Sequence, residues 1–267
     1  MLPARYWVYV WAGAFIAINW LSVTITPPKE TILLGYFLGS LSASATLAAA
    51  WSALGPGPVI WRLPLSIAWV CMLLVAVGIN ISINSGPSNG VFVVGTWLFV
   101  QWLLLQLPLW TLNAGLGFHL RYREDANAES DAASVRFGLR DLLITMAIVG
   151  VLLGIIRALV SGVQMASGSE LPIFIFLGVA GMIMTFPLVV APLMQRMALP
   201  GVALAILFMC AATYGELISF EQIAGPGPSI EDFIAINATS AIVILLVAGV
   251  VRLSGYSLRK KSQPMNL

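Results

Sequence analysis

Long apolar runs separated by short polar or turn-rich breaks dominate the pattern of this chain. A bilayer core about 30 Å thick takes roughly 20 helical residues to cross. Eight runs have about this length, and they cover residues 6–25, 31–51, 63–84, 91–115, 141–161, 171–194, 198–218 and 232–253. They lack the strict polar–apolar alternation of membrane-barrel strands. The pattern therefore predicts an all-α, polytopic integral membrane protein with about eight transmembrane helices.

Proline and glycine mark most of the breaks between these runs, as in Gly55-Pro56-Gly57-Pro58 and Gly225-Pro226-Gly227-Pro228. Such compositions favour turns over helices. The boundary between the sixth and seventh runs is the least certain, because only the few residues around 195–198 separate them. We expect these two runs to form a tight helical hairpin.

The positions of lysine and arginine predict the orientation in the membrane. If the N-terminus is cytoplasmic, all but two of the 13 Lys and Arg residues fall on the cytoplasmic side, and the exceptions are Lys29 and Arg157. Basic residues accumulate on the cytoplasmic side of membrane proteins. The charge pattern therefore predicts cytoplasmic N- and C-termini, which agrees with an even number of spans.

A polar segment divides the chain into two parts. Residues 119–140 carry many charged and small polar side chains, which cannot bury enough apolar surface to fold alone. We therefore predict a Trp-rich four-helix half at 1–118, a cytoplasmic linker with a basic stem at 119–140, a Met-rich four-helix half at 141–253 and a basic tail at 254–267. A 4+4 arrangement is typical of duplicated parallel repeats. However, the halves show no evident residue-level similarity, and the confinement of all 9 Trp to the first half argues against a recent duplication.

The end of the linker carries a short recognisable motif. Residues 136–143 read Arg-Phe-Gly-Leu-Arg-Asp-Leu-Leu, which resembles an F-[SG]-[LI]-R-[DT]-L-L stem found before a spanning helix in many uncharacterised bacterial membrane proteins. The resemblance implies a bacterial inner-membrane protein and no particular activity. Arg136 and Arg140 would share one helix face. They are interpreted either as a plain topology anchor or as contacts for anionic lipid headgroups or a docked protein.

Ionisable residues inside the spans are the first candidates for a functional site, because only 9% of the chain is charged and charge in a bilayer is costly. Two such residues exist, Arg157 in the fifth run and Glu216 in the seventh. Both are predicted to lie near the outer face at a similar depth. One hypothesis is that they pair or line one outward-facing polar pocket. The alternative is that each side chain snorkels separately to the interface.

Familiar catalytic and cofactor motifs are missing from the sequence. The single histidine, His119, is predicted at the edge of the fourth span, and the spans contain no paired aspartates, metalloprotease motif or serine-hydrolase elbow. The motif for ATP binding is also missing, and a net charge of +2 does not indicate a nucleic-acid partner. We therefore predict no catalytic, cofactor-binding or metal-binding residues, and enzymatic activity is the less expected alternative.

Uncharged polar residues concentrate in the fourth span, at Gln101, Gln106 and Asn113, with Pro108 among them. Amides of this kind either fasten helices together or contribute to a midplane binding site. Three functions follow as alternatives. The first is a non-enzymatic membrane component that organises partners through the 119–140 linker. The second is a small-solute transporter or channel, and the third is an intramembrane enzyme acting on lipid or peptide.

Overall fold

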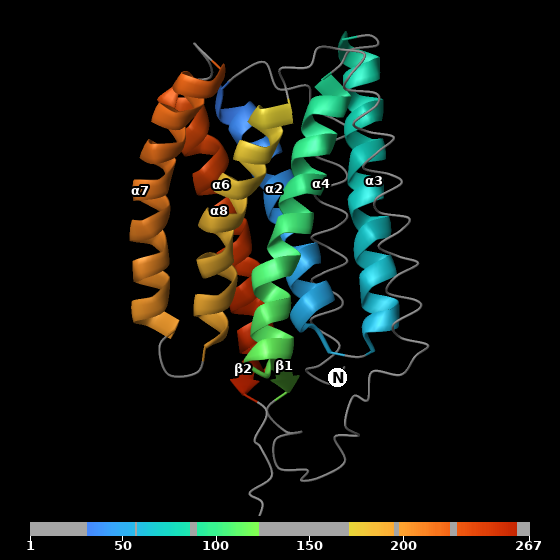
Figure 1. Ribbon diagram of the computed structural model, residues 1–267, viewed down its shortest axis with the longest axis vertical. Coiled ribbons are helices and arrows are strands. Elements are labelled where there is room, and N and C mark those ends of the chain that lie inside the picture. Colours follow the sequence, from blue (N-terminus) through green and yellow to red (C-terminus); the bar gives the residue numbers. More distant parts are fainter. Residues whose placement is uncertain are drawn as a thin grey trace, which may run out of the picture.

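The computed structural model describes residues 31–56, 58–85, 90–122, 171–194, 198–224 and 229–260. Most of these residues are helical, and the helices lie side by side as one bundle (Figure 1). The predicted spans at 6–25 and 141–161 lie outside the described residues. The other six predicted runs are all found as helices.

The described elements follow one another along the chain in a simple order. The helices are α2 (Thr31–Leu54), α3 (Val59–Ser85), α4 (Gly90–Trp110), α6 (Leu171–Leu193), α7 (Ala198–Ala224) and α8 (Ile230–Leu253). A π-helical turn, η1 (Thr111–Gly115), continues α4, and the strands are β1 (Phe118–Tyr122) and β2 (Tyr256–Lys260). A capping box of Ser229 and Asp232 begins α8.

Five of the described helices are long and apolar enough to cross a membrane. The candidate spans are Gly35–Leu54, Val59–Gly78, Ile175–Leu193, Leu199–Phe220 and Ile230–Leu253. Helix α4 packs among them, against α2 and α6. The described chain is therefore a helical bundle whose dimensions and hydropathy are those of a membrane protein.

Helix α3 begins at Val59, earlier than the predicted start at residue 63. The reason is the side chain of Arg62, which is buried and donates hydrogen bonds to the carbonyl oxygens of Gly55 and Trp51 at the end of α2. The last carbonyl groups of a helix have no partner in the helix itself, and a cation there is favourable. An arginine that satisfies them can remain inside the following helix.

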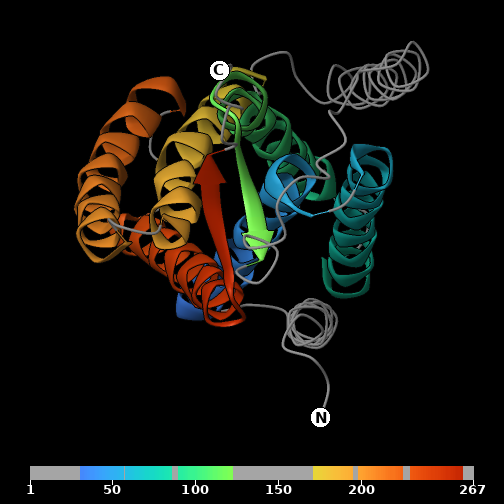
Figure 2. The ribbon, with the colours of Figure 1, turned by 90° about the horizontal axis from the view of Figure 1, so that it is seen from below.

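A two-stranded antiparallel sheet was not expected from the sequence. Strand β1 lies where the irregular linker was predicted to begin, and it pairs with β2 in the tail, with Leu120 opposite Leu258 at the centre of the register. The chain enters the strands through Gly117 (φ 72°) and Gly255 (φ 91°), a backbone conformation that glycine adopts without strain. The strands cross the end of the bundle (Figure 2), so the all-α prediction holds for the spans but not for this end.

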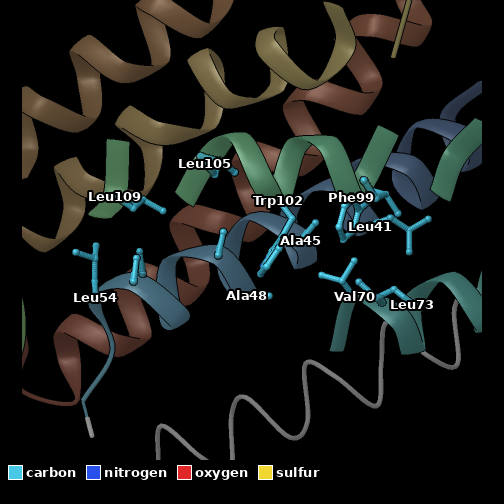
Figure 3. Packing of buried hydrophobic residues seen from close by; sticks show 14 of the residues in the cluster. Leu41, Ala45, Ala48, Leu54, Val70, Leu73, Phe99, Trp102, Leu105 and Leu109 are labelled. Carbon is cyan, nitrogen blue, oxygen red and sulfur yellow. The ribbon is translucent and has the colours of Figure 1, made fainter. Parts of the chain in front are cut away.

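The largest buried cluster joins α2, α3 and α4. Leu41, Val70, Leu73, Phe99 and Trp102 all belong to it (Figure 3). The facing residues on α2 are mostly small, including Ala45, Ala48 and Ala49. Small residues on one helix admit large side chains from its neighbours, and this is the usual way in which membrane helices pack closely.

The order of the elements repeats along the chain. The series α2, α3, α4 and β1 is followed by the series α6, α7, α8 and β2. Seen along the bundle, α3 and α7 lie on opposite sides, as do α4 and α8, with the two strands crossing between them (Figure 2). An approximate two-fold axis along the bundle therefore relates the two series, and it passes through the Leu120–Leu258 pair.

Sequence similarity accompanies this repeat. Helices α3 and α7 both have 27 residues. Matching residues recur at nearly constant separation: Phe37-Leu38-Gly39 with Phe176-Leu177-Gly178, Cys71 with Cys210, Gly86-Pro87 with Gly225-Pro226, and Gly117-Phe118-His119-Leu120-Arg121 with Gly255-Tyr256-Ser257-Leu258-Arg259. The prediction that the halves lack residue-level similarity is therefore wrong. Exchanges among apolar residues within the spans conceal the few matching positions.

Close helix contacts obey the same repeat. A Cβ atom at Gly39 of α2 would lie 2.4 Å from the Ile236 carbonyl oxygen of α8, and one at Gly178 of α6 would lie 2.5 Å from Cγ1 of Val100 in α4. Gly35 also lies against α8, at Ala235. The glycines thus join each series to the other, since α2 packs on α8 and α6 packs on α4.

Candidate functional site

The amide side chains of Gln101 and Gln106 in α4 and of Asn113 in η1 all bond to α2. Gln101 Nε2 donates to Ser42 Oγ (2.9 Å) and to Thr46 Oγ1 (3.0 Å). Gln106 Oε1 accepts from Ser52 Oγ (3.0 Å), and Asn113 donates to the Ala53 carbonyl oxygen. These contacts support the interpretation of the amides as groups that fasten helices together. Within the described residues Gln106 Nε2 alone among these amide nitrogens has no partner.

A second polar cluster lies between α7 and α8. Asn237 Nδ2 donates to Glu216 Oε2 (2.9 Å) and to Thr213 Oγ1 (3.1 Å). The Thr213 hydroxyl donates to the Met209 carbonyl oxygen (2.9 Å) and lies 3.9 Å from Sδ of Met184 in α6. Three helices therefore meet at this point. Thr213, Glu216 and Asn237 are called the Glu216 cluster below.

Glu216 is buried within a candidate span. Its side chain is 8% exposed, whereas Leu204, Leu207 and Tyr214 of the same helix are each more than 60% exposed. Glu216 therefore faces the bundle while most of α7 faces outward. It lies about two turns inside the end of α7, because the helix continues to Ala224 and not only to residue 218 as predicted. Its contact is thus inside the protein rather than at a membrane surface.

The other predicted site residues lie outside the described residues. They are Arg157, the proposed partner of Glu216, and Arg136 and Arg140 of the stem. Pairing of Arg157 with Glu216 stays a prediction, as do the lipid contacts of the stem. Asn237 and Thr213 were not predicted from the sequence. One feature of the sequence could have indicated them, namely that Asn237 lies within an apolar span at the same depth as Glu216.

The repeat identifies a matching location in the first series. The counterparts of Thr213 and Glu216 on α3 are Leu74 and Val77, and the counterpart of Asn237 on α4 is Leu98. Val77 and Leu98 are buried members of the main apolar cluster. The same helix contact is therefore apolar in one series and polar in the other.

Charged residues are unevenly distributed along the bundle. At the sheet end lie the described basic positions Arg62, Arg121, Arg252, Arg259 and Lys260, whereas Glu216, Glu231 and Asp232 lie toward the opposite end. Arg252 Nη1 donates to the carbonyl oxygens of Pro192 (2.5 Å) and Met194 (2.8 Å), which ties the ends of α8 and α6 together. The basic end is thus a built part of the fold and not only a charged tail.

The Glu216 cluster has limited chemical capacity. It contains one carboxylate, one amide and one hydroxyl, which suffices to exchange a proton but supplies no nucleophile with an adjacent base. Among the described residues no group of three or more His, Cys, Asp or Glu side chains forms a metal site. No family model, no curated protein and no solved structure matches this chain.

Proposed function

We propose that this chain is a multi-pass protein of a bacterial inner membrane that organises partners at its cytoplasmic face and performs no enzymatic chemistry itself. The proposal includes about eight spans and cytoplasmic N- and C-termini. Its support comes from the apolar helices, from the placement of charge and from the way in which the linker and the tail are joined.

The proposed topology rests on charge and on the repeat. The described basic positions gather at the sheet end, which is the end expected to face the cytoplasm. Each series of three described helices would gain one further span, at 6–25 and at 141–161, to give four plus four. A reporter fused after residue 267 tests this topology. Cytoplasmic activity of the reporter is expected, and periplasmic activity would contradict the model.

The organising role rests chiefly on the β1–β2 pairing. This pairing holds the first residues of the 119–140 linker beside the first residues of the 254–267 tail. The buried face of the sheet includes Tyr256 and Leu258, so the linker leaves the bundle from a fixed position. A linker that starts on a rigid support is well placed to present a docking segment to a partner protein.

Replacement of residues 124–135 by a Gly/Ser segment of equal length tests the organising role, because it leaves β1 and the basic stem intact. Cross-linking in cells followed by mass spectrometry is expected to recover a defined partner with the wild type and to lose it with this variant. A matched replacement of residues 225–228, at the opposite end, is the control and should retain the partner. An unchanged set of cross-linked proteins in all three samples would contradict the proposal.

A small-solute transporter is the second candidate, and the Glu216 cluster favours it. A buried carboxylate in a span is a common feature of substrate and ion pathways. Uptake measurements in proteoliposomes that contain the wild type or E216Q test this function. Solute uptake that depends on Glu216 would favour the transporter over the organising role.

A further inference from the structure

The Glu216 cluster is not required by the architecture of the bundle. Its counterparts in the first series, Leu74, Val77 and Leu98, make the same helix contact with apolar side chains alone. Val77 has no exposed surface. The fold therefore accepts apolar packing at this point, and the carboxylate in the second series calls for a reason other than helix packing.

The described surroundings of Glu216 provide no cation to balance a carboxylate. Helix α6 contains no titratable residue between Leu171 and Leu193. The described titratable or charged residues on the other two elements are Cys210, Tyr214 and Glu221 on α7, and Glu231, Asp232 and Arg252 on α8. Arg252 bonds to carbonyl oxygens at the far end of α6. Within the described chain, the groups nearest along the helices are thus acidic or neutral.

Asn237 is a partner that accommodates both states of a carboxyl group. In the observed arrangement its two amide hydrogens point to Glu216 and Thr213, which suits an ionised carboxylate. Rotation of the amide by half a turn would present its carbonyl oxygen, which accepts a hydrogen bond from a protonated carboxyl group. A lysine or arginine in this place would hold the ionised state alone.

We infer that the Glu216 cluster is a proton-binding site, in which Glu216 takes up a proton from water and Asn237 bonds to the carboxyl group in both states. The nearer end of the bundle, which carries Glu231 and Asp232, lies about two helical turns away and would be the side of proton entry. The site is independent of the partner-organising role, since it lies at the other end of the bundle from the sheet.

Infrared difference spectroscopy of the full-length protein in lipid nanodiscs tests this inference. A pH titration in sodium-free buffer is expected to show the carbonyl-stretch band of a protonated carboxylic acid, which appears as the pH falls. The band should be missing in E216Q. In the control variants E231Q and D232N, which alter acids at the start of α8, it should remain.

A second variant distinguishes the site from a carboxyl group that titrates without Asn237. In N237L the band is expected to move to higher frequency, because the carboxyl group loses its hydrogen-bond partner, while E216Q shows no band at all. Two outcomes would overturn the inference. One is the lack of any E216Q-sensitive band, as a permanent ion pair with Arg157 would produce. The other is loss of the band when sodium chloride replaces choline chloride at constant pH, which would identify a sodium site instead.

Discussion

The α3–α4 contact and the α7–α8 contact occupy equivalent places in the two series, yet their chemistry is opposite. Val77 of α3 is buried in an apolar cluster with Leu98 of α4. Glu216 of α7 instead accepts a hydrogen bond from Asn237 of α8. Two equivalent pairs of helices thus pack in the same way, one without polar groups at the contact and one with them. The difference shows that the fold requires a close helix contact at this place but does not require the polar side chains found there in the second series.

The largest loss of stability is expected when a carboxylate is placed in the apolar series. In V77E the carboxylate would lie among apolar side chains without an asparagine opposite it. We expect a loss of on the order of 3 kcal/mol in the free energy of unfolding, the cost of an unpaired charge inside a membrane span. Equilibrium unfolding in mixed micelles measures it, with V77T as a nearly isosteric, uncharged control that should lose far less. A V77E protein as stable as V77T would mean that this contact is open to water.

The two glycine contacts provide the next test, because they are equivalent in the repeat but differ in what opposes them. A methyl group at Gly39 would meet the backbone of α8 at the Ile236 carbonyl oxygen, whereas one at Gly178 would meet the side chain of Val100. A backbone atom can move away from the added methyl group less easily than a side chain can. We therefore expect the free energy of unfolding to fall by about 2–3 kcal/mol in G39A and by about 1 kcal/mol in G178A.

The control for the glycine comparison is G249A, since no atom lies within 4 Å of a Cβ built there. Alanine is favoured over glycine inside a helix, so this variant should be neutral or slightly more stable than the wild type. Thermal unfolding in one detergent ranks the three variants. Equal losses in G39A and G178A would show that the α2–α8 contact relaxes as readily as the α6–α4 contact.

The length of the hydrophobic runs alone predicted most of the helices, but it did not predict which face of each helix turns toward the bundle. The six described helices match predicted runs because about twenty apolar residues in a bilayer have few other folds. Which face of α7 turns inward depends on close packing such as that of Gly201 against Ala191 of α6. The hydrogen bond between Glu216 and Asn237 follows from that packing. It therefore could not be predicted, although both residues were visible in the sequence.

The sheet could not be predicted for a different reason. Residues 118–122 and 256–259 each alternate apolar and polar residues after a glycine, but such short segments cannot form a stable strand without a partner. The partner is the equivalent segment of the other series, and only the repeat brings the two together. Detection of the repeat in the sequence would have predicted both strands.

A smaller difference is expected at a pair of equivalent threonines. Thr46 of α2 accepts a hydrogen bond from Gln101 (3.0 Å), whereas its counterpart Thr185 donates within its own helix to the Gly181 carbonyl oxygen (2.6 Å). T46V should lower the free energy of unfolding by about 1 kcal/mol, because it leaves an amide hydrogen of the fully buried Gln101 unpaired. T185V should lower it by less. A double-mutant cycle of T46V with Q101L measures the coupling, and additive losses would show that the bond contributes nothing.

The smallest effect on stability is expected where the second series is made to resemble the first. E216V restores the residue found at the equivalent position of α3, and it removes a charged group that the packing does not require. We expect its free energy of unfolding to lie within about 0.5 kcal/mol of the wild type, in contrast to V77E. E216A is the matched control, since it also removes the carboxylate but leaves a cavity, and it should be less stable than E216V. If E216V unfolds as readily as V77E, the carboxylate is a structural element of the α7–α8 contact, and the two series differ in what holds them together rather than in what they bind.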